Sequence, residues 1–280
     1  MSNVLYLCPT PIGNLSDMTF RAVECLKAAD LIAAEDTRHT RKLLAHFEIH
    51  KELVRYDEHN KETAGPWLIE KLQQGQSIAL VSDAGMPGIS DPGSDLVRLA
   101  IAAGIAVVPL PGANAALCAL IASGLDTRAF TFLGFLPKTK KKQIELLNSL
   151  QAHPYSLLFY ESPHHLLTTL AVLREVLGDR PAVAGRELTK KFEEFVRGTL
   201  SELIEHFTQQ PPRGEFSLVV SGCEQEIVTE LVVPDEAGLA AAVASLTAEG
   251  LAPKEAMRQV AAKYDLTKRE VYQAVLACKD

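Results

Sequence analysis

The sequence lacks the features that mark several large classes of protein. It contains no apolar run long enough to cross a membrane, and its first residues, MSNVLYLCPTP, lack the basic start and long apolar core of a secretion signal. We therefore expect a cytoplasmic protein that does not bind membranes. Its five cysteines are odd in number and never in CxxC spacing, so neither a disulfide framework nor a zinc site is predicted.

Familiar catalytic and nucleotide-binding motifs are also missing. The sequence has no GxxxxGK[ST] phosphate loop and no GxGxxG at its first strand and helix, which weakens the case for ATP or NAD. Ser82 and Asp83 lie in no GxSxG elbow, which argues against an esterase triad. The histidines of ESPHH have no partner at HExxH spacing, so we expect no metal there and interpret SPHHLL as a helix start capped by Ser162.

Two patterns of apolar residues alternate along most of the chain. Short apolar runs such as LIAAED, SIALVSD and IAVVPLPG are typical of buried strands, whereas TFRAVECLKAAD and SDLVRLAIAAG carry apolar residues at helical spacing. This alternation predicts a mainly parallel sheet with helices on its faces. The pattern resumes after residue 115, so we expect an α/β fold with two domains, residues 1–114 and 115–228, and a cleft between them. In the second domain, Phe130, Phe132 and Phe135 alternate as in a buried strand and are expected to pack in the core.

The last segment, residues 234–280, has a different composition, rich in Ala, Leu, Lys and Glu. APKEAMRQVAAKY and TKREVYQAVLA are predicted to be two helices around a tight DL turn, and Thr267 and Glu270 form a capping box for the second. These features favour a small helical appendage of helix-turn-helix type. A helical tail packed on the body is the alternative.

An irregular loop occupies the middle of LVSDAGMPGISDPGSDLV, residues 80–97, which holds three glycines and two prolines. The loop follows a predicted strand and precedes a predicted helix, so it lies at the carboxyl edge of a parallel sheet, where such sheets bind ligands. Glycine lets the backbone approach a ligand closely, and proline fixes the shape of the loop. A loop with so little positive charge favours a zwitterionic or modestly cationic nucleoside over a phosphate.

Basic residues gather in three clusters on a chain whose net charge is −7. The charge argues against nonspecific coating of nucleic acid, but local patches on an acidic protein still attract a polyanion. The clusters DTRHTRK, LPKTKKK and GRELTKK can together bind a polyanion such as RNA, although for any single cluster we favour the alternative of a solvated loop. The candidate RNA-binding residues are Arg38, His39, Arg41, Lys138, Lys140, Lys141, Arg186 and Lys190.

Carboxylates accompany two of these clusters. Glu35 and Asp36 stand beside the cations of AAEDTRHT, and Glu187 stands in GRELTK. A hydroxyl group is a poor nucleophile at neutral pH, and a positioned base adds roughly 10²- to 10⁴-fold to its rate of reaction. We therefore take these three acids as candidate catalytic residues. The alternative for each acid is a structural role, in a salt bridge at the end of a strand.

Seven motifs in register resemble the tetrapyrrole methylase superfamily, and within it the branch that methylates ribosomal RNA. They are PTPIGNLSDMTFRA, AAEDTRHT, LVSDAGMPGISDPG, PLPGANAALCALIASGL, FLGFLP, FYESPHH and GRELTK. The resemblance implies a homodimer with S-adenosyl-L-methionine in the cleft between two α/β domains. It also implies that the acceptor is the ribose 2′-hydroxyl of a cytidine in the decoding region of small-subunit (16S) ribosomal RNA.

The resemblance also implies a set of cofactor-binding residues. Gly85 to Pro87 occupy the place of the Gly-Asp-Pro of the superfamily, with Met86 in place of the acid, so any contact made by that acid is lost here. Tyr160 or Glu161 ends the fifth-strand motif, and Leu188 stands where the family has a glycine before a threonine. The full set is Ile12, Asp83, Gly85, Met86, Pro87, Ile89, Asn114, Ala115, Tyr160, Glu161 and Leu188.

Two other functions are compatible with parts of this pattern. A small-molecule methyltransferase acting on a tetrapyrrole would share the fold and the methyl donor, but it needs neither three basic clusters nor a helical tail. A noncatalytic RNA-binding protein would need the clusters but not the loop of glycine and proline. The ribosomal RNA methyltransferase accounts for both features.

Overall fold

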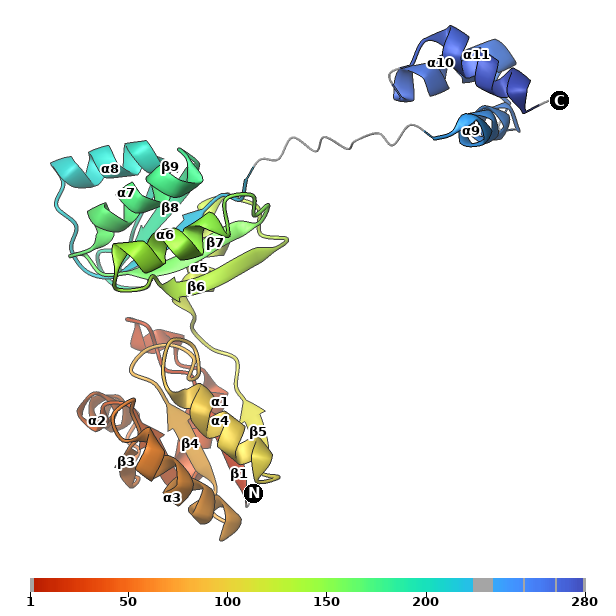
Figure 1. The fold of residues 1–280 in the computed structure, drawn as a ribbon. Helices are drawn as coiled ribbons and strands as arrows, with labels where there is room; N and C mark the ends of the chain where they lie inside the picture. The colour runs from red at the N-terminus through yellow and green to blue at the C-terminus, as the bar shows by residue number, and fades with distance from the viewer. Residues whose placement is uncertain (1–2, 224–233, 249, 265, 279–280) are drawn as a thin grey trace. The chain divides into compact units, whose positions relative to one another are not determined.

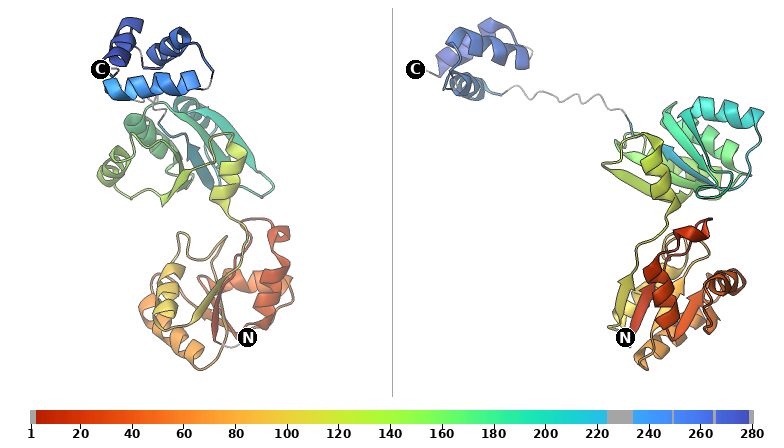
Figure 2. Two further views of the ribbon diagram at one scale, coloured as in Figure 1. Left: turned by 90° about the vertical axis from the view of Figure 1, so that its right-hand side faces the viewer. Right: turned by 180° about the vertical axis from the view of Figure 1, so that it is seen from behind.

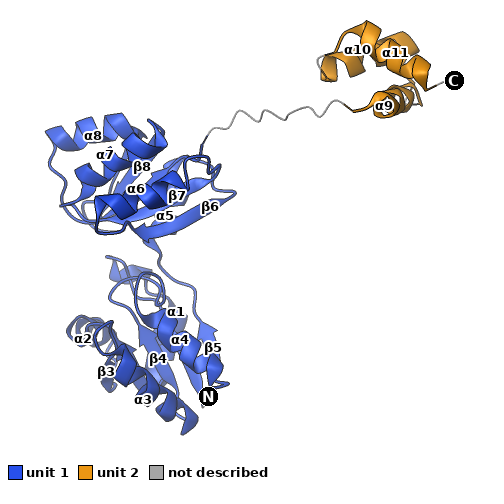
Figure 3. Ribbon diagram, in the orientation of Figure 1, with its two compact units in different colours: residues 1–223 blue, residues 224–280 orange. Residues whose placement is uncertain are grey.

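The computed structural model describes residues 3–223, 234–248, 250–264 and 266–278 (Figure 1). The chain divides into two units, residues 1–223 and residues 224–280 (Figure 3). The first unit holds two sheets, and the second is helical. The domain end predicted at residue 228 lies outside the described residues.

The first sheet is entirely parallel, as the alternating patterns predict. Its strands run in the order β3-β2-β4-β1-β5. They are β1 (Val4–Leu7), β2 (Leu31–Ala34), β3 (Leu53–Arg55), β4 (Ile78–Val81) and β5 (Ala106–Pro109). Helices cover both faces (Figure 2), so the central strands β2 and β4 are buried and apolar along their whole length.

Two apolar cores hold these helices on the first sheet. On one face lie α1 (Phe20–Ala28) and α2 (Thr37–His46), and on the other lie α3 (Lys61–Gln73) and α4 (Gly93–Ala102). A short 3₁₀ turn, η1 (Leu15–Asp17), precedes α1. This layering leaves the carboxyl ends of the strands, and the loops that follow them, free of helix cover.

The second sheet is mixed, in contrast to the mainly parallel arrangement expected. Its strands run in the order β6-β7-β10-β8-β9, and of these pairs only β6 with β7 is parallel. They are β6 (Phe130–Phe135), β7 (Ser156–Glu161), β8 (Pro181–Arg186), β9 (Glu194–Thr199) and β10 (Phe216–Val220). The difference arises because β8 folds back into β9 and β10 then enters between β7 and β8.

Helices also cover both faces of the second sheet. One face packs on α6 (Lys140–Asn148), α7 (Leu166–Leu177) and α8 (Leu200–Gln209), which lie together in Figure 1. The other face packs on α5 (Ala115–Ser123), which follows β5 after a short connection. The chain therefore passes from one sheet to the other just before residue 115.

Two local expectations were wrong. A β-bulge between Phe132 and Gly134 breaks the alternation of β6 and leaves Phe135 60% exposed, while Phe130, at the start of this edge strand, is 41% exposed instead of buried. Ser162 does not cap α7, because that helix begins at Leu166 after His165, whose side chain makes no capping bond. The hydroxyl of Ser162 is instead buried without a hydrogen-bond partner among the described residues.

The second unit contains three helices around one small apolar core. These are α9 (Glu236–Ala248), α10 (Pro253–Lys263) and α11 (Lys268–Ala277). The capping box is confirmed, since the Thr267 hydroxyl accepts the Glu270 N–H and the Glu270 carboxylate accepts the Thr267 N–H. The predicted DL turn includes residue 265, which lies outside the described residues. None of the helices in the described ranges combines the length and the apolar character that crossing a bilayer demands.

Candidate functional site

The loop after β4 is fastened to the loop after β1. Backbone N–H groups of Thr10 and Gly85 each donate to the carbonyl of the other residue, at 2.9 and 3.0 Å. The hydroxyl of Thr10 also donates to the carbonyl of Ser82 at 3.1 Å. Gly85 has φ +80°, a left-handed conformation that side chains with a Cβ rarely adopt. The predicted loop is thus a fixed structure at the carboxyl edge of the sheet.

The Asp91 carboxylate fixes the second part of the loop. It accepts the N–H of Gly88 at 2.8 Å and the N–H of Gly93 at 2.7 Å. Burial raises the pKa of Asp91, although these N–H groups oppose the shift. The carboxylate therefore holds two backbone amides that would otherwise be partly buried without partners.

A cavity of about 640 Å³, called cavity A here, opens beside this loop. Residues of both sheets line it, which places it between the two halves of the first unit. Nine of the predicted cofactor residues line cavity A: Ile12, Asp83, Gly85, Ile89, Asn114, Ala115, Tyr160, Glu161 and Leu188. Met86 and Pro87 are not among its lining residues. The size of cavity A is that of a typical small-molecule site.

The loops of the first sheet contribute mainly negative charge to cavity A. Glu35, Asp83 and Asp91 all line it. Burial, and then the nearby charge of Asp83, raise the pKa of Glu35 above its ordinary value. Glu161, from the second half, is occupied internally, because its carboxylate accepts the Ser162 N–H and the Thr169 hydroxyl. The cavity is therefore suited to a ligand with positive charge.

We expect Glu35→Gln to raise the melting temperature near neutral pH. A carboxyl whose pKa is raised by folding favours the folded state only while it is protonated, so its ionisation destabilises the protein as pH rises through that pKa. The stabilisation by glutamine should shrink as pH falls below the ordinary carboxylate range. Melting curves of both proteins across pH test this, and a less stable glutamine variant at neutral pH would contradict it.

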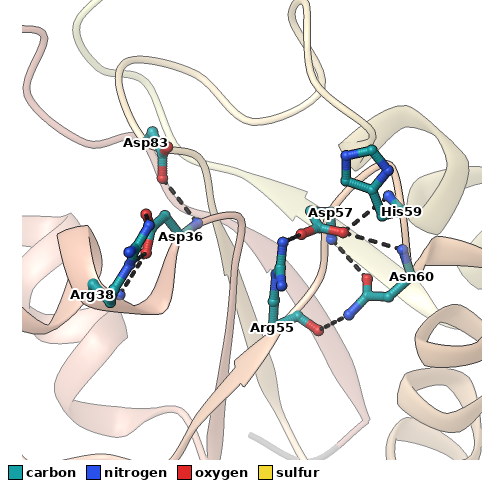
Figure 4. Close-up of polar contacts among 7 residues, drawn as sticks. All are labelled: Asp36, Arg38, Arg55, Asp57, His59, Asn60 and Asp83. Atoms are coloured by element: carbon teal, nitrogen blue, oxygen red, sulfur yellow. Dashed lines mark hydrogen bonds and ion pairs between the residues drawn. The ribbon is translucent and has the colours of Figure 1, made fainter.

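Asp36 and its neighbours form a different kind of cluster, shown in Figure 4. Asp36 caps α2 by accepting the Arg38 N–H at 2.8 Å, and its carboxylate also binds the Arg38 guanidinium. The side-chain hydrogen bond from Arg38 holds the pKa of Asp36 well below its usual range. The Asp83 carboxylate in turn accepts the Asp36 N–H at 3.0 Å. The Asp36 carboxylate is thus taken up by Arg38, and its N–H links the end of β2 to the end of β4. Glu35, in contrast, lines cavity A.

A second group at the end of β3 was not predicted. Asp57 is buried, accepts the N–H groups of His59 and Asn60, and pairs with Arg55 (Figure 4). Arg55, Asp57 and His59 line a further cavity of about 560 Å³ together with the Glu35–Arg38 segment. No group of three or more His, Cys, Asp or Glu side chains in the described residues is arranged to hold a metal ion.

A smaller cavity of about 500 Å³, called cavity B here, adjoins cavity A. His39, Lys42 and Lys190 line it, so cavity B carries more positive charge than cavity A. Of the other predicted RNA-binding residues, Arg41, Lys138, Lys140 and Lys141 are exposed. Arg186 is half-buried and tied to the Arg213 carbonyl and to Glu194.

Several residues of cavity A were not found from the sequence. Asp91 could have been suspected, because an acid before proline in a glycine-rich loop is well placed to accept backbone N–H groups. Glu215 and Phe135 gave no signal, since each reaches the cavity only through the pairing of strands distant in sequence.

Comparison with known proteins decides the family. A family model described as Tetrapyrrole (Corrin/Porphyrin) Methylases matches residues 4–204. The chain belongs to the tetrapyrrole methylase family. The resemblance of its motifs to this family is thereby confirmed.

Close relatives of this tetrapyrrole methylase carry a more specific name. It is 52% identical over 268 residues to a Halalkalibacterium halodurans protein named ribosomal RNA small subunit methyltransferase I, covering 96% of this chain and 93% of that protein. A Bacillus subtilis protein of the same name is 51% identical over 272 residues, covering 97% of this chain and 93% of the relative. The match extends through the second unit.

A solved structure of the family shares the fold. Uroporphyrin-III C-methyltransferase from Thermus thermophilus, crystallised with S-adenosyl homocysteine, has a TM-score of 0.53 at 20% identity, covering 77% of this chain and 96% of that one. The likeness confirms the two-sheet α/β architecture of the first unit.

Proposed function

We propose that the chain is an S-adenosyl-L-methionine-dependent methyltransferase that methylates the ribose 2′-hydroxyl of a cytidine in the decoding region of 16S ribosomal RNA. The observation that carries the proposal is the meeting of an acidic cavity, built on a fixed backbone loop, with a more basic cavity beside it. The names of relatives about half identical to this chain support small-subunit ribosomal RNA as substrate over a tetrapyrrole. A noncatalytic RNA-binding protein would need the more basic cavity but not the acidic one, so the two cavities together favour an enzyme.

S-adenosyl-L-methionine suits the charge of cavity A. Its sulfonium is a cation, and the carboxylates of Glu35 and Asp83 line the cavity. Because Glu35 faces cavity A and does not line cavity B, we propose that its charge acts on the donor. Glu35→Gln should therefore weaken binding of S-adenosyl-L-methionine more than binding of its neutral product S-adenosyl homocysteine, as calorimetry with the two ligands would measure.

Cavity B suits the acceptor nucleotide. Methyl transfer from a sulfonium is an in-line displacement, so the ribose oxygen has to lie about 3 Å from the methyl carbon on the side opposite sulfur. A nucleotide in cavity B would approach the donor through the wall that the two cavities share. His39 and Lys42 then lie where they can contact its phosphates.

We expect the lysines at the start of α6 to bind phosphates and not bases. Lys140, Lys141 and Lys142 are exposed in the first turn of that helix. Each lysine that displaces a counterion changes the slope of log affinity against log salt by about 0.7 to 0.9. Neutralising all three should flatten the slope measured by filter binding. Mass-spectrometric mapping should find the methylated nucleotide unchanged, and a different position would contradict the assignment.

The proposed enzyme works as a homodimer in the cytoplasm, where its RNA substrate is found. Exposed apolar side chains on α5 support self-association, since Leu117 and Ile121 lie one turn apart on one face and are 43% and 74% exposed.

The direct test of this function uses purified protein, labelled S-adenosyl-L-methionine and small ribosomal subunits from cells that lack the gene. Label should enter the 16S RNA at one cytidine, on its 2′-oxygen. Label on a base, or on added tetrapyrrole and not on RNA, would contradict the proposal.

A further inference from the structure

Cavities A and B share one wall, and Lys190 lies in it. The side chains common to both cavities are those of Ile12, Ser82, Asp83, Ala84, Lys190 and Glu215. Among the described residues that line cavity A, Lys190 is the only one with a positive charge. The wall is where a methyl group has to pass from a donor in cavity A to an acceptor in cavity B.

Two carboxylates hold the ammonium group of Lys190 in place. Its Nζ lies 2.9 Å from Glu187 Oε1 and 2.9 Å from Glu215 Oε2. Partial burial alone would lower the pKa of Lys190, but the hydrogen bonds to Glu215 and Glu187 outweigh it and raise that pKa. Lys190 is therefore a cation at neutral pH and donates hydrogen bonds.

The backbone around Lys190 is built to fix its position. Glu187 and Thr189 both adopt left-handed conformations, with φ +48° and +66°, which are costly for residues other than glycine. The stem of Lys190 crosses Gly13 so closely that a Cβ built on Gly13 would lie 2.3 Å from Lys190 Cγ. A strained turn and a glycine from the other half thus place one lysine at the shared wall.

The chemistry of this cluster suits a hydroxyl better than a phosphate. Glu187 and Glu215 leave the group around Lys190 with a net negative charge, which repels a phosphate. A ribose hydroxyl can accept a hydrogen bond from the ammonium and donate its own proton to a carboxylate. Lys140 to Lys142, in contrast, are exposed at the start of a helix, and the ion pair of Lys140 with Glu175 is itself exposed, so a phosphate can replace the carboxylate there.

We propose that Lys190 is a catalytic residue that contacts the acceptor ribose oxygen, and that Glu215 takes the proton of that hydroxyl. A lone pair of the oxygen forms the new bond to the methyl carbon, and the carbon–sulfur bond breaks with its electron pair left on sulfur. The hydroxyl proton passes to the Glu215 carboxylate. Lys190 donates a hydrogen bond to the other lone pair of the oxygen, which holds the oxygen in line and stabilises the partial negative charge that removal of its proton by Glu215 places on it. This inference rests on the proposed methyl transfer to a ribose.

The test compares Lys190→Met with Lys27→Met in single-turnover methyl transfer to small ribosomal subunits at saturating donor and RNA. The Lys190 variant should be slower by roughly a hundredfold or more, while the donor affinity and the RNA affinity stay within about threefold. Lys27 is exposed on α1, belongs to none of the three basic clusters and lines neither cavity, so its variant should keep the normal rate. Glu215→Gln should also slow transfer without weakening donor binding.

Three further variants separate catalysis from folding. Lys190→Ala should regain part of its rate when methylammonium is added, because a small ammonium ion can occupy the vacated place. Gly13→Ala should slow transfer by displacing the lysine stem. If Lys190→Met fails to fold, Lys190→Arg, which keeps the charge but changes its shape, should bind the donor and transfer slowly.

The possible failures are distinguishable. Normal transfer by Lys190→Met would overturn this inference and leave the proposed function intact. So would a variant that loses only RNA affinity, with a smaller slope of log affinity against log salt, because Lys190 would then bind a phosphate. Absence of transfer to RNA by the unchanged protein would overturn the proposed function and this inference with it.

Discussion

Replacing Gly85 by valine is expected to weaken S-adenosyl-L-methionine binding by roughly thirtyfold or more, about 2 kcal/mol. Gly85 lines cavity A with φ +80°, a conformation that a β-branched residue strongly disfavours. A Cβ there would lie 3.3 Å from Ile12 Cγ2 and 3.4 Å from the Ala113 carbonyl oxygen. The valine would push apart the two loops that form the cavity. Calorimetry with the folded variant measures the effect.

Gly75→Val is the matched control for this substitution. Gly75 also has a left-handed conformation, with φ +93°, but a Cβ there would meet no atom within 4 Å. It precedes β4, at the end of the strand opposite cavity A. Both variants should melt at lower temperature because both backbones are strained, and only Gly85→Val should lose donor affinity. Equal donor affinity in the two variants would remove this loop from the donor site.

Asp91→Ala is expected to weaken donor binding more than tenfold, about 1.4 kcal/mol, and to lower the stability of the fold. Removing the carboxylate leaves the N–H groups of Gly88 and Gly93 without their partner. An unsatisfied buried N–H costs about 1–3 kcal/mol. The loop should rearrange to recover these bonds and distort the wall of cavity A. Calorimetry and denaturant unfolding measure the two effects.

Asp91→Asn and Asp126→Ala are the controls for this variant. Asparagine keeps an oxygen that can accept both N–H groups, so most of the donor affinity should remain. Asp126 also accepts a backbone N–H, that of Arg128, but in an exposed loop where water can replace it. An asparagine variant as weak as the alanine variant would mean that the charge of Asp91, and not its hydrogen bonds, matters for the donor.

The first sheet and the position of the irregular loop after β4 could be predicted because their signals are local. β2 and β4 are continuous apolar runs, and the loop of residues 82–92 stands at a strand-to-helix junction where parallel sheets bind ligands. Once the loops of several strands meet at one edge, residues as distant as Ile12 and Asn114 line the same cavity. The order of elements explains why they meet at one edge, whereas the choice of these two residues came from the resemblance to the tetrapyrrole methylases.

The second half could not be predicted so well because its geometry depends on distant pairing. β10 enters between β7 and β8, which makes the sheet mixed and brings Glu215 to the cavity. The bulge in β6 turns Phe135 out of the core, and its sign in FTFLGFL is Gly134, which has φ +61° and was overlooked beside the alternating phenylalanines. The sequence likewise grouped Glu35 with Asp36, whereas capping of α2 occupies Asp36 and leaves Glu35 facing cavity A.

The most direct test of the central claim is mass-spectrometric mapping of methyl groups on 16S ribosomal RNA from cells with and without the gene. The account predicts that one ribose methyl group, on a cytidine of the decoding region, disappears when the gene is removed. It also predicts that the unchanged gene restores this methyl group and that a Gly85→Val copy does not. An identical set of methyl groups in the two strains would contradict the account.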